Sequence, residues 1–419
     1  MRALAIIDGE HYGPVVRDAL ASLPYEFVAV WLAGGTEKLR GGEDYGLPVA
    51  ADLEAAVAEH EPEAVVDLSD EPVLGPRERF GVASRVLALG LPYVGADFRF
   101  DPPDYTPFPL PSLAVIGTGK RVGKTAVTGH LARLLARDRD VVVVAMGRGG
   151  PPGPEVAEVR PTLERLLELS RGGRHAASDY LETAALAGVV TIGCRRCGGG
   201  LAGAPGESNV LAGAALAAER EPDVVVFDGS GATVPPIEVG ARVLVTSTSQ
   251  PLEVAAGYLN AYRILISDLV VATGGESAEL ERAIAEVKPG VGVVPAELRP
   301  RPVSPIAGRQ VAFFTTAPPV AHETLARHLR EAYAAEVVHV SGNLARRPEL
   351  RAELERVEAE VYLVEIKAAA IDVVAEAALE RGVELVFADN ELVASGGATL
   401  DDELLALADR AAAKEPAVS

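Results

Sequence analysis

The segment 113–125, with the sequence LAVIGTGKRVGKT, constrains the fold of this chain more than any other segment. An apolar run typical of a buried strand, 113–116, passes through a glycine-rich turn into a stretch with a helical pattern, 126–137. Backbone N–H groups of such a turn, together with the N-terminus of the following helix, bind phosphate groups. The segment therefore predicts a phosphate-binding loop. Its expected nucleotide-binding residues are Gly117, Thr118, Gly119, Lys120, Arg121, Val122, Gly123, Lys124 and Thr125.

The side chains of this loop predict particular roles at a bound nucleotide. Lys124 is expected to reach the β- and γ-phosphates, and the Thr125 hydroxyl is expected to bind Mg²⁺. Asp228 ends the apolar run 224–227 and is expected to be the partner carboxylate for Mg²⁺ or its water shell. The usual pattern has glycine where this chain has Thr118, and Gly117 lies one residue early. The loop predicts ATP and Mg²⁺ as ligands.

Short β-branched runs alternate with Ala-, Leu-, Glu- and Arg-rich helical stretches along the whole chain. This alternation is typical of βαβ units and mostly parallel sheets. Two proline-rich stretches interrupt it: 101–111 is interpreted as a linker, and 299–305 as the second break between domains. We therefore expect three α/β domains, 1–110, 111–300 and 301–419. The central one is P-loop NTPase-like with a mostly parallel sheet, and the third has a structural or interface role.

Composition limits the partners of the protein. With 39 basic and 60 acidic residues the formal net charge is −21, which argues against nucleic acid and anionic membranes. No uncharged apolar run approaches the roughly 18 residues that a membrane helix needs. Only two cysteines occur, which favours a reducing cytoplasm over a disulfide scaffold. Only six of the basic residues are lysines, and two of these, Lys120 and Lys124, lie in the phosphate loop.

Three arginines in the central domain are candidates for binding phosphate groups. Arg148 follows the strand-like run 141–146, at the end of a strand where ligands of parallel sheets bind. Arg195 and Arg196 lie between Cys194 and Cys197, on what we interpret as a glycine-rich loop. A Cys-x-x-Cys pair also fits a redox or zinc site. We favour phosphate binding by the arginines, with the cysteines packed beneath them.

The remaining candidates depend on weaker patterns. Asp179 and Glu182 are spaced to share one face of a helix, so Glu182 is a possible metal contact. Favourable charge at a helix N-terminus explains both residues equally well. His11 follows the first strand among polar neighbours and is expected either to bind substrate phosphate or to be merely solvated. Arg99 follows a later strand of the same domain and is a further candidate for binding an anion.

Five segments together resemble the cyclic 2,3-diphosphoglycerate synthetase family. They are IDGEHY at 7–12, GTGKRVGKT at 117–125, GRGGP at 147–151, TIGCRRCGGG at 191–200 and FDGSGA at 227–232. The shifted first glycine of the phosphate loop is also similar to that of dethiobiotin synthetase-type ATPases. The resemblance covers the first two domains in order. Its most specific parts are the Arg-Arg pair between the cysteines and the opening segment.

The resemblance implies a ligase that closes the two phosphates of 2,3-diphosphoglycerate into an intramolecular phosphoanhydride, while ATP becomes ADP and phosphate. It also implies Mg²⁺ dependence and a cytoplasmic enzyme. The nucleotide-binding class often dimerises, so a homodimer is expected. Lys120, Lys124 and Arg148 are the expected catalytic residues, and His11, Arg99, Arg148, Arg195 and Arg196 the expected substrate-binding residues. Thr125, Asp228 and Glu182 are the expected metal contacts.

Three alternative functions remain open. A dethiobiotin-type ligase would activate a carboxylate and would need an apolar acceptor pocket. A 2-phosphoglycerate kinase would release ADP without free phosphate. A non-metabolic ATPase switch would hydrolyse ATP slowly, without stimulation by a small molecule.

Overall fold

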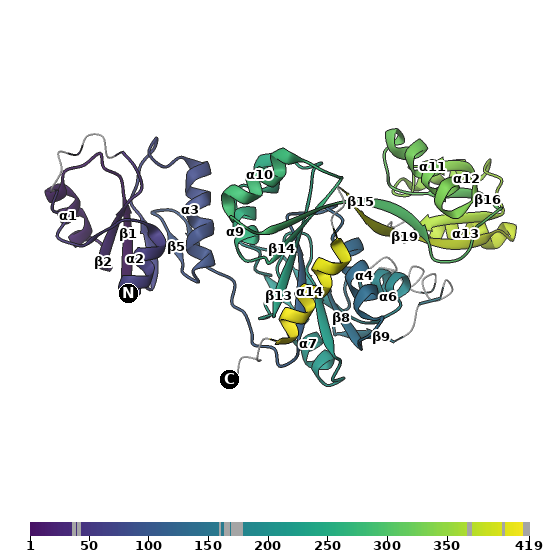
Figure 1. Ribbon diagram of the computed structural model, residues 1–419, viewed down its shortest axis with the longest axis horizontal. Helices are drawn as coiled ribbons and strands as arrows, with labels where there is room; N and C mark the ends of the chain where they lie inside the picture. Colours follow the sequence, from purple (N-terminus) through teal and green to yellow (C-terminus); the bar gives the residue numbers. More distant parts are fainter. Residues whose placement is uncertain are drawn as a thin grey trace.

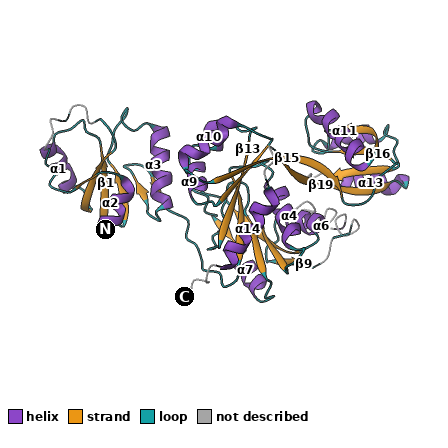
Figure 2. Ribbon diagram, viewed as in Figure 1, coloured by secondary structure: helices purple, strands orange, loops and turns teal. Residues whose placement is uncertain are grey.

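The protein is described by a computed structural model, and the structure describes residues 1–35, 39, 43–158, 161–162, 168, 179–366, 371–395 and 399–413. Three parts follow one another along the longest axis (Figure 1). Across the described residues these parts contain two sheets, one of six strands and one of 13 strands. Helices flank both sheets (Figure 2). The predicted α/β class is confirmed.

The first part holds the six-stranded sheet, in the order β3-β2-β1-β4-β5-β6. All its pairs are parallel except β5 with β6. The central strand β1 is buried over almost its whole length, as expected for an apolar run in a parallel sheet. The elements are β1 Arg2–Ile7, α1 Gly13–Ser22, β2 Glu26–Leu32, β3 Val49–Ala50, α2 Leu53–His60, β4 Ala64–Asp67, α3 Pro76–Ala88, β5 Tyr93–Val94 and β6 Arg99–Phe100.

The central part contains the phosphate-loop segment. Five of its strands, β8, β12, β7, β13 and β14, are adjacent, parallel and almost fully buried. The elements are β7 Ser112–Gly117, α4 Lys124–Leu135, β8 Val141–Gly147, β9 Glu155–Ala157, α6 Asp179–Ala187, β10 Val190–Cys197, β11 Glu207–Ser208, α7 Val210–Ala218, β12 Val224–Asp228, β13 Ala241–Ser247, α8 Leu252–Ala255, α9 Asn260–Leu265, β14 Leu269–Thr273, α10 Ala278–Val287 and β15 Gly292–Pro302. The predicted mostly parallel sheet is confirmed.

The third part continues the same sheet through β15-β19-β18-β16-β17. Strands β16 to β19 are mutually parallel, and β15 pairs with β19 in antiparallel fashion. The elements are β16 Gln310–Phe314, a 3-10 turn Pro319–Ala321, α11 His322–Tyr333, β17 Glu336–Ser341, α12 Arg347–Leu354, β18 Val361–Glu365, α13 Ile371–Arg381, β19 Glu384–Ala394 and α14 Leu400–Ala413.

The stretch 299–305, interpreted as a break between domains, is mostly strand. The strand β15 runs into it as far as Pro302, so the sheet continues across the expected break. Only 292–296 of β15 pairs with β14, whereas 296–302 pairs with β19. Beyond residue 296 the strand therefore pairs on one side only. Proline is tolerated there because its missing N–H faces away from the ladder.

The last helix, α14, returns to the central part, although it follows the third part in the chain (Figure 1, yellow). Leu404, Leu407 and Ala411 of α14 are buried in one apolar cluster with strands β7, β8 and β13 and helix α4. Asp401 lies 2.6 Å from His130 Nε2 of α4. The domain division stays a prediction. Helix α14, which falls within its third domain, 301–419, packs on the central sheet.

Among the described residues, none of the helices combines the length and the apolar character needed to cross a bilayer.

Candidate functional site

The phosphate loop joins β7 to α4, and two of its glycines are required by close packing. A side-chain carbon at Gly117 would lie 3.0 Å from the carbonyl oxygen of Gly231. Gly123 precedes α4 with φ 87°, a left-handed conformation that favours glycine. A carbon added there would lie 2.9 Å from Thr273 Cγ2. Gly123 therefore needs glycine, and a side chain at Gly117 would press on the loop after β12.

Thr118 stands where the usual pattern has glycine, and its contacts explain the difference. Its backbone N–H donates to Val245 O at 3.0 Å. Its hydroxyl donates to Gln250 Oε1 at 2.6 Å and lies 3.2 Å from the Thr246 hydroxyl. The side chain thus fastens the start of the loop to the end of β13. Sequence reasoning missed Gln250, although the chain has only two glutamines.

Lys124 and Asp228 form a buried ion pair at the centre of the site. Lys124 Nζ contacts Asp228 Oδ1, and their side chains are 9% and 0% exposed. The Thr128 hydroxyl donates to the same carboxylate oxygen at 2.8 Å. Asp228 ends β12, which pairs with β7 on one side and β8 on the other. The fold therefore brings together two residues that lie 104 positions apart.

The oxygen donors at this point fit Mg²⁺. Mg²⁺ is usually held by one or two protein oxygens together with substrate phosphates and water. The Asp228 carboxylate and the Thr125 hydroxyl, at the first turn of α4, are donors of this kind. No cluster of three or more His, Cys, Asp or Glu side chains suited to a metal occurs in the described part of the chain. The residues thus fit a metal shared with phosphate rather than one held by protein alone.

Arg196 reaches the loop that follows Asp228. It is 5% exposed, and its NH2 group donates to Ser230 O at 2.9 Å. Its NH1 group donates to Gly198 O. A side-chain carbon at Gly231 would lie 3.6 Å from Lys120 Cγ and 3.8 Å from Arg196 NH2. The structure therefore brings Arg196 and Lys120 together beside the loop after β12.

The two arginines lie in strand β10, so their expected place on a glycine-rich loop is wrong. Side chains alternate along a strand. Cys194 and Arg196 are accordingly buried, whereas Arg195 and Cys197 are exposed. Burial raises the pKa of the Cys194 thiol to about 12. Because the two sulfurs lie on opposite faces of β10, they do not form the joint Cys-x-x-Cys redox or zinc site.

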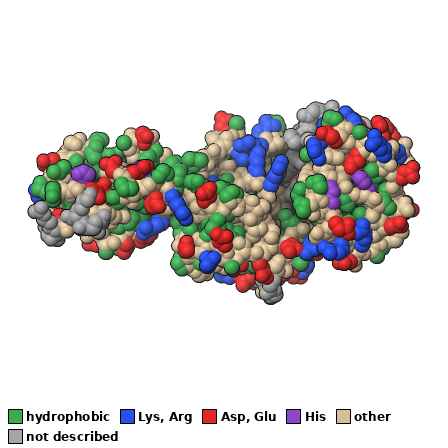
Figure 3. Space-filling view, turned by 90° about the horizontal axis from the view of Figure 1, so that it is seen from above, with side chains coloured by type: hydrophobic (Ala, Val, Ile, Leu, Met, Phe, Trp, Pro, Cys, Tyr) green, Lys and Arg blue, Asp and Glu red, His purple; other side chains and the backbone are tan. Residues whose placement is uncertain are grey.

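Arg195 and Arg148 lie at the ends of neighbouring strands. Residue 195 pairs with residue 147 of β8, and Arg195 Nε donates to Gly150 O at 2.7 Å. Arg148 is exposed in the turn that follows β8. A side-chain carbon at Gly150 would lie only 2.0 Å from Cys194 O, so this turn packs tightly on β10. Lys and Arg side chains gather over the middle part on the face in Figure 3, beside a hollow.

Glu182 lies on α6, which packs against α4 and β8. Glu182 is 4% exposed, so its carboxylate is buried on a helix that packs against α4. A role for Glu182 at a metal stays a prediction. The side chain of Asp179, its predicted neighbour, lies outside the described residues.

His11 and Arg99 lie in the first part. His11 Nδ1 lies 3.2 Å from the buried Asp8 carboxylate, and 57% of its side chain is exposed. Arg99 pairs with Asp101 at 2.7 Å, and the hydrogen bond that Arg99 donates to this carboxylate raises the pKa of Arg99. In the described part neither side chain hydrogen-bonds the phosphate loop. Their substrate-binding roles stay predictions.

Two residues that sequence reasoning missed contact the loops of this site. Asn260 Nδ2 donates to the carbonyl oxygen of Thr118 at 3.0 Å. Arg263, one helical turn later, donates to the carbonyl oxygen of Ala232. The scarcity of asparagine, with four in the chain, is a signal that could have directed attention to Asn260.

Comparison with known proteins covers nearly the whole chain. Family models described as the N-terminal, P-loop and C-terminal domains of cyclic 2,3-diphosphoglycerate synthetase match residues 2–101, 112–297 and 302–391. A relative of that name from Rubrobacter xylanophilus is 53% identical, over 97% of this chain and 97% of the relative. Relatives of the same name from Thermococcus kodakarensis (42%; 97% and 98%) and Methanothermus fervidus (37%; 98% and 97%) also match.

Proposed function

Because the chain belongs to the cyclic 2,3-diphosphoglycerate synthetase family, we propose that it makes the cyclic phosphoanhydride from 2,3-diphosphoglycerate and ATP, releasing ADP and phosphate. The family matches confirm the resemblance seen in the sequence. One observation carries the assignment of the site: cationic side chains lie at the carboxyl edge of the central sheet in a protein of net charge −21. Two substrate phosphates that must meet need such a concentration of positive charge.

In the first step, an oxygen of one substrate phosphate attacks the γ-phosphorus of ATP, and the bond from that phosphorus to the β-phosphate oxygen breaks. ADP leaves, and the substrate phosphate is now joined to the transferred group. Lys124 and Lys120 would stabilise the charge on the transferred group. The Thr125 hydroxyl and the Asp228 carboxylate would hold Mg²⁺, which supplies charge neutralisation to the nucleotide phosphates when bound. Nucleotide phosphate would take the place of Asp228 as the partner of Lys124.

In the second step, an oxygen of the other substrate phosphate attacks the activated phosphorus. The bond to the transferred group breaks, inorganic phosphate leaves, and the ring closes. Arg148 and Arg195 would hold the two phosphates near each other. Within the described residues, the side chain of Arg195 donates only through Nε, to Gly150. This leaves its two terminal nitrogens for a phosphate group. Arg196, bonded to two carbonyl oxygens, would add its charge beside Lys120.

The test is phosphorus NMR of the products that the full chain forms from ATP, Mg²⁺ and 2,3-diphosphoglycerate. We expect ADP, inorganic phosphate and one new cyclic diphosphate in equal amounts. Lys124→Ala should abolish all three. Release of ADP and phosphate without a new organic phosphate would indicate an ATPase switch. Conversion of 2-phosphoglycerate with release of ADP alone would indicate a kinase. Release of phosphate only when a carboxylate acceptor is present would indicate a dethiobiotin-type ligase. Each of these results would overturn the assignment.

We further propose a cytoplasmic homodimer. Both cysteines are free, which fits a reducing compartment. Light scattering on the purified chain should give twice the monomer mass of 43.6 kDa. A mass near 43.6 kDa at micromolar concentration would overturn the dimer.

A further inference from the structure

Arg263 is a buried cation that contacts three separate segments of backbone. It is 2% exposed and lies on α9. Its Nε and NH2 groups both donate to the carbonyl oxygen of Ala232, in the loop after Asp228. Its NH2 group also donates to Leu201 O at 3.1 Å, in the loop after β10, and its NH1 group to Leu259 O at 2.8 Å. One guanidinium therefore ties two loops of the site to the start of α9.

Asn260 extends this connection to the phosphate loop. Its side-chain nitrogen donates to Thr118 O at 3.0 Å and to Val254 O at 2.7 Å. Its side-chain oxygen accepts a hydrogen bond from Arg263 NH1 at 3.1 Å. Hydrogen bonds therefore run unbroken from the phosphate loop through Asn260 and Arg263 to the loops after β12 and β10.

The segment that carries both residues is also held from the other side. The Ser84 hydroxyl of α3, in the first part, donates to Tyr258 O at 3.2 Å. The ring of Phe80 meets the edge of Tyr258 with centroids 5.5 Å apart. Leu259 and Tyr262 are buried in the apolar cluster of the first part. The start of α9 is thus held by contacts with the first part on one side and with the loops of the site on the other.

Burial of Arg263 is unfavourable for its charge and lowers the pKa of the guanidinium to about 10. Its described hydrogen bonds go to carbonyl and amide oxygens rather than to a carboxylate. An apolar side chain of similar size would avoid the desolvation of a charge but would leave these oxygens without their donor. What the arginine contributes is a fixed arrangement of the segments that it binds.

We propose that Asn260 and Arg263 are positioning residues that set the phosphate loop relative to the loops after β12 and β10. They act through the main chain of those loops. The proposal rests on one element of the proposed function, the binding of a nucleotide by the phosphate loop.

The decisive variant is Asn260→Asp. It keeps the oxygen that accepts from Arg263 and gives that buried cation a carboxylate partner, but it removes the donor to Thr118 O and Val254 O. The new ion pair offsets part of this loss, so thermal stability should fall no more than in the control variant below, whereas the phosphate loop loses its support. We expect binding of a non-hydrolysable ATP analogue with Mg²⁺, measured by calorimetry, to weaken roughly tenfold. In turnover assays the KM for ATP should rise more than kcat falls.

Lys288→Met is the matched control. Lys288 Nζ donates to Leu265 O at 2.9 Å and Ser267 O at 2.6 Å, at the other end of α9, so its loss removes equivalent bonds away from the site. Its affinity for the analogue should equal that of the wild type. Unchanged affinity in Asn260→Asp, or an equal loss in both variants, would overturn the proposal. Since the analogue binds without the second substrate, the proposal can hold even where no cyclic product forms.

Discussion

Replacing Gly150 by alanine should push the turn that carries Arg148 away from strand β10, which carries Arg195. The added carbon would lie 2.0 Å from Cys194 O, and ordinary contact begins at 3.4 Å. The turn after β8 must therefore move away from β10 by about 1.4 Å to restore ordinary contact. That movement also strains the hydrogen bond from Arg195 Nε to Gly150 O.

The expected effect is larger on catalysis than on stability. A displacement of about 1 Å in groups that hold reacting phosphates can lower the rate about a hundredfold. Overpacking of this kind destabilises a fold by roughly 1–3 kcal/mol. We therefore expect Gly150→Ala to form the cyclic product about a hundred times more slowly. Binding of the ATP analogue should be nearly normal, because the clash is with β10 rather than with the phosphate loop.

Gly153→Ala is the control, because a carbon added at Gly153 meets nothing within 4 Å. Turnover is measured by phosphorus NMR, nucleotide affinity by calorimetry and stability by thermal unfolding, on both variants. Unchanged turnover in Gly150→Ala would refute the reasoning. A loss of ATP affinity equal to the loss of turnover would also refute it, since the damage would then include the phosphate loop.

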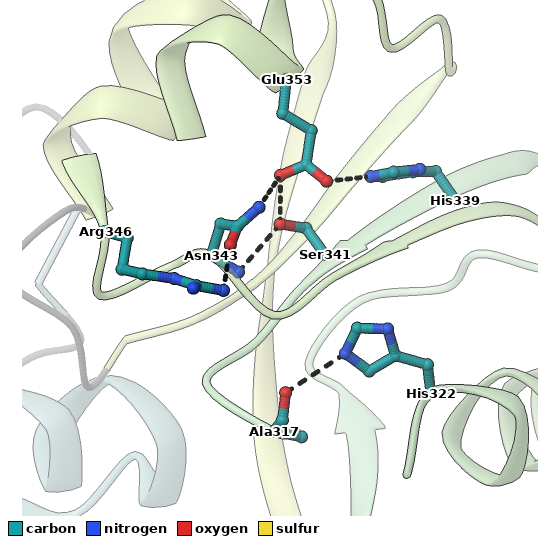
Figure 4. A network of polar contacts seen from close by, with 7 residues as sticks. All are labelled: Ala317, His322, His339, Ser341, Asn343, Arg346 and Glu353. Carbon is teal, nitrogen blue, oxygen red and sulfur yellow. Dashed lines mark hydrogen bonds and ion pairs between the residues drawn. The ribbon is translucent and has the colours of Figure 1, made fainter. Parts of the chain in front are cut away.

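Three further predictions follow from other parts of the molecule. Arg148→Ala should reduce turnover strongly while ATP binding stays within about twofold, and unchanged turnover with 2,3-diphosphoglycerate would contradict the assigned role. Iodoacetamide at pH 8 should modify Cys197 but not Cys194, whose pKa of about 12 keeps it protonated, and two modified thiols per native chain by mass spectrometry would contradict this. In the network of Figure 4, burial alone would raise the pKa of Glu353, but hydrogen bonds from Ser341, Asn343 and His339 lower it overall. The stabilisation by Glu353 is therefore present above the ordinary glutamate pKa of 4.5 and is lost as pH falls through the lower folded value, so Glu353→Gln should flatten the acid side of the stability curve in thermal unfolding.

Much of the site could be predicted because local pattern encodes it. The loop between β7 and α4 has to follow an apolar strand and begin a helix, and both features lie within 113–137. Asp228 ends a buried strand and forms an ion pair with Lys124 of the loop, and the roles of both residues at a bound nucleotide stay predictions. The glycines after Cys197 suggest a loop, but pairing with β8 up to Arg195, and with β11 at Arg196 and Cys197, extends the strand through both cysteines.

Long-range pairing decided what the sequence could not predict. Pro300 and Pro302 of β15 indicate a break between domains when read alone. They are compatible with a strand only because 297–302 pairs on one side, with β19. Asp389 of β19 then lies between Arg133 of α4 and Arg301 of β15. Its Oδ2 is 2.5 Å from Arg133 NH1 and 2.9 Å from Arg301 NH2. Asp389 therefore connects the third part to α4, the helix that follows the phosphate loop.

By itself the sequence determined the α/β class, the P-loop segment between its strand and its helix, and the family. These properties depend on residues that are neighbours in the chain, where strand, turn and helix preferences act directly. Only the tertiary structure decided that α14 packs on the central sheet, that the two cysteines face apart, and that Asn260 and Arg263 connect three loops. Such contacts form where apolar surfaces from distant parts of the chain pack together and where buried carbonyl oxygens need hydrogen-bond donors. Neither condition can be predicted from a single segment of the sequence.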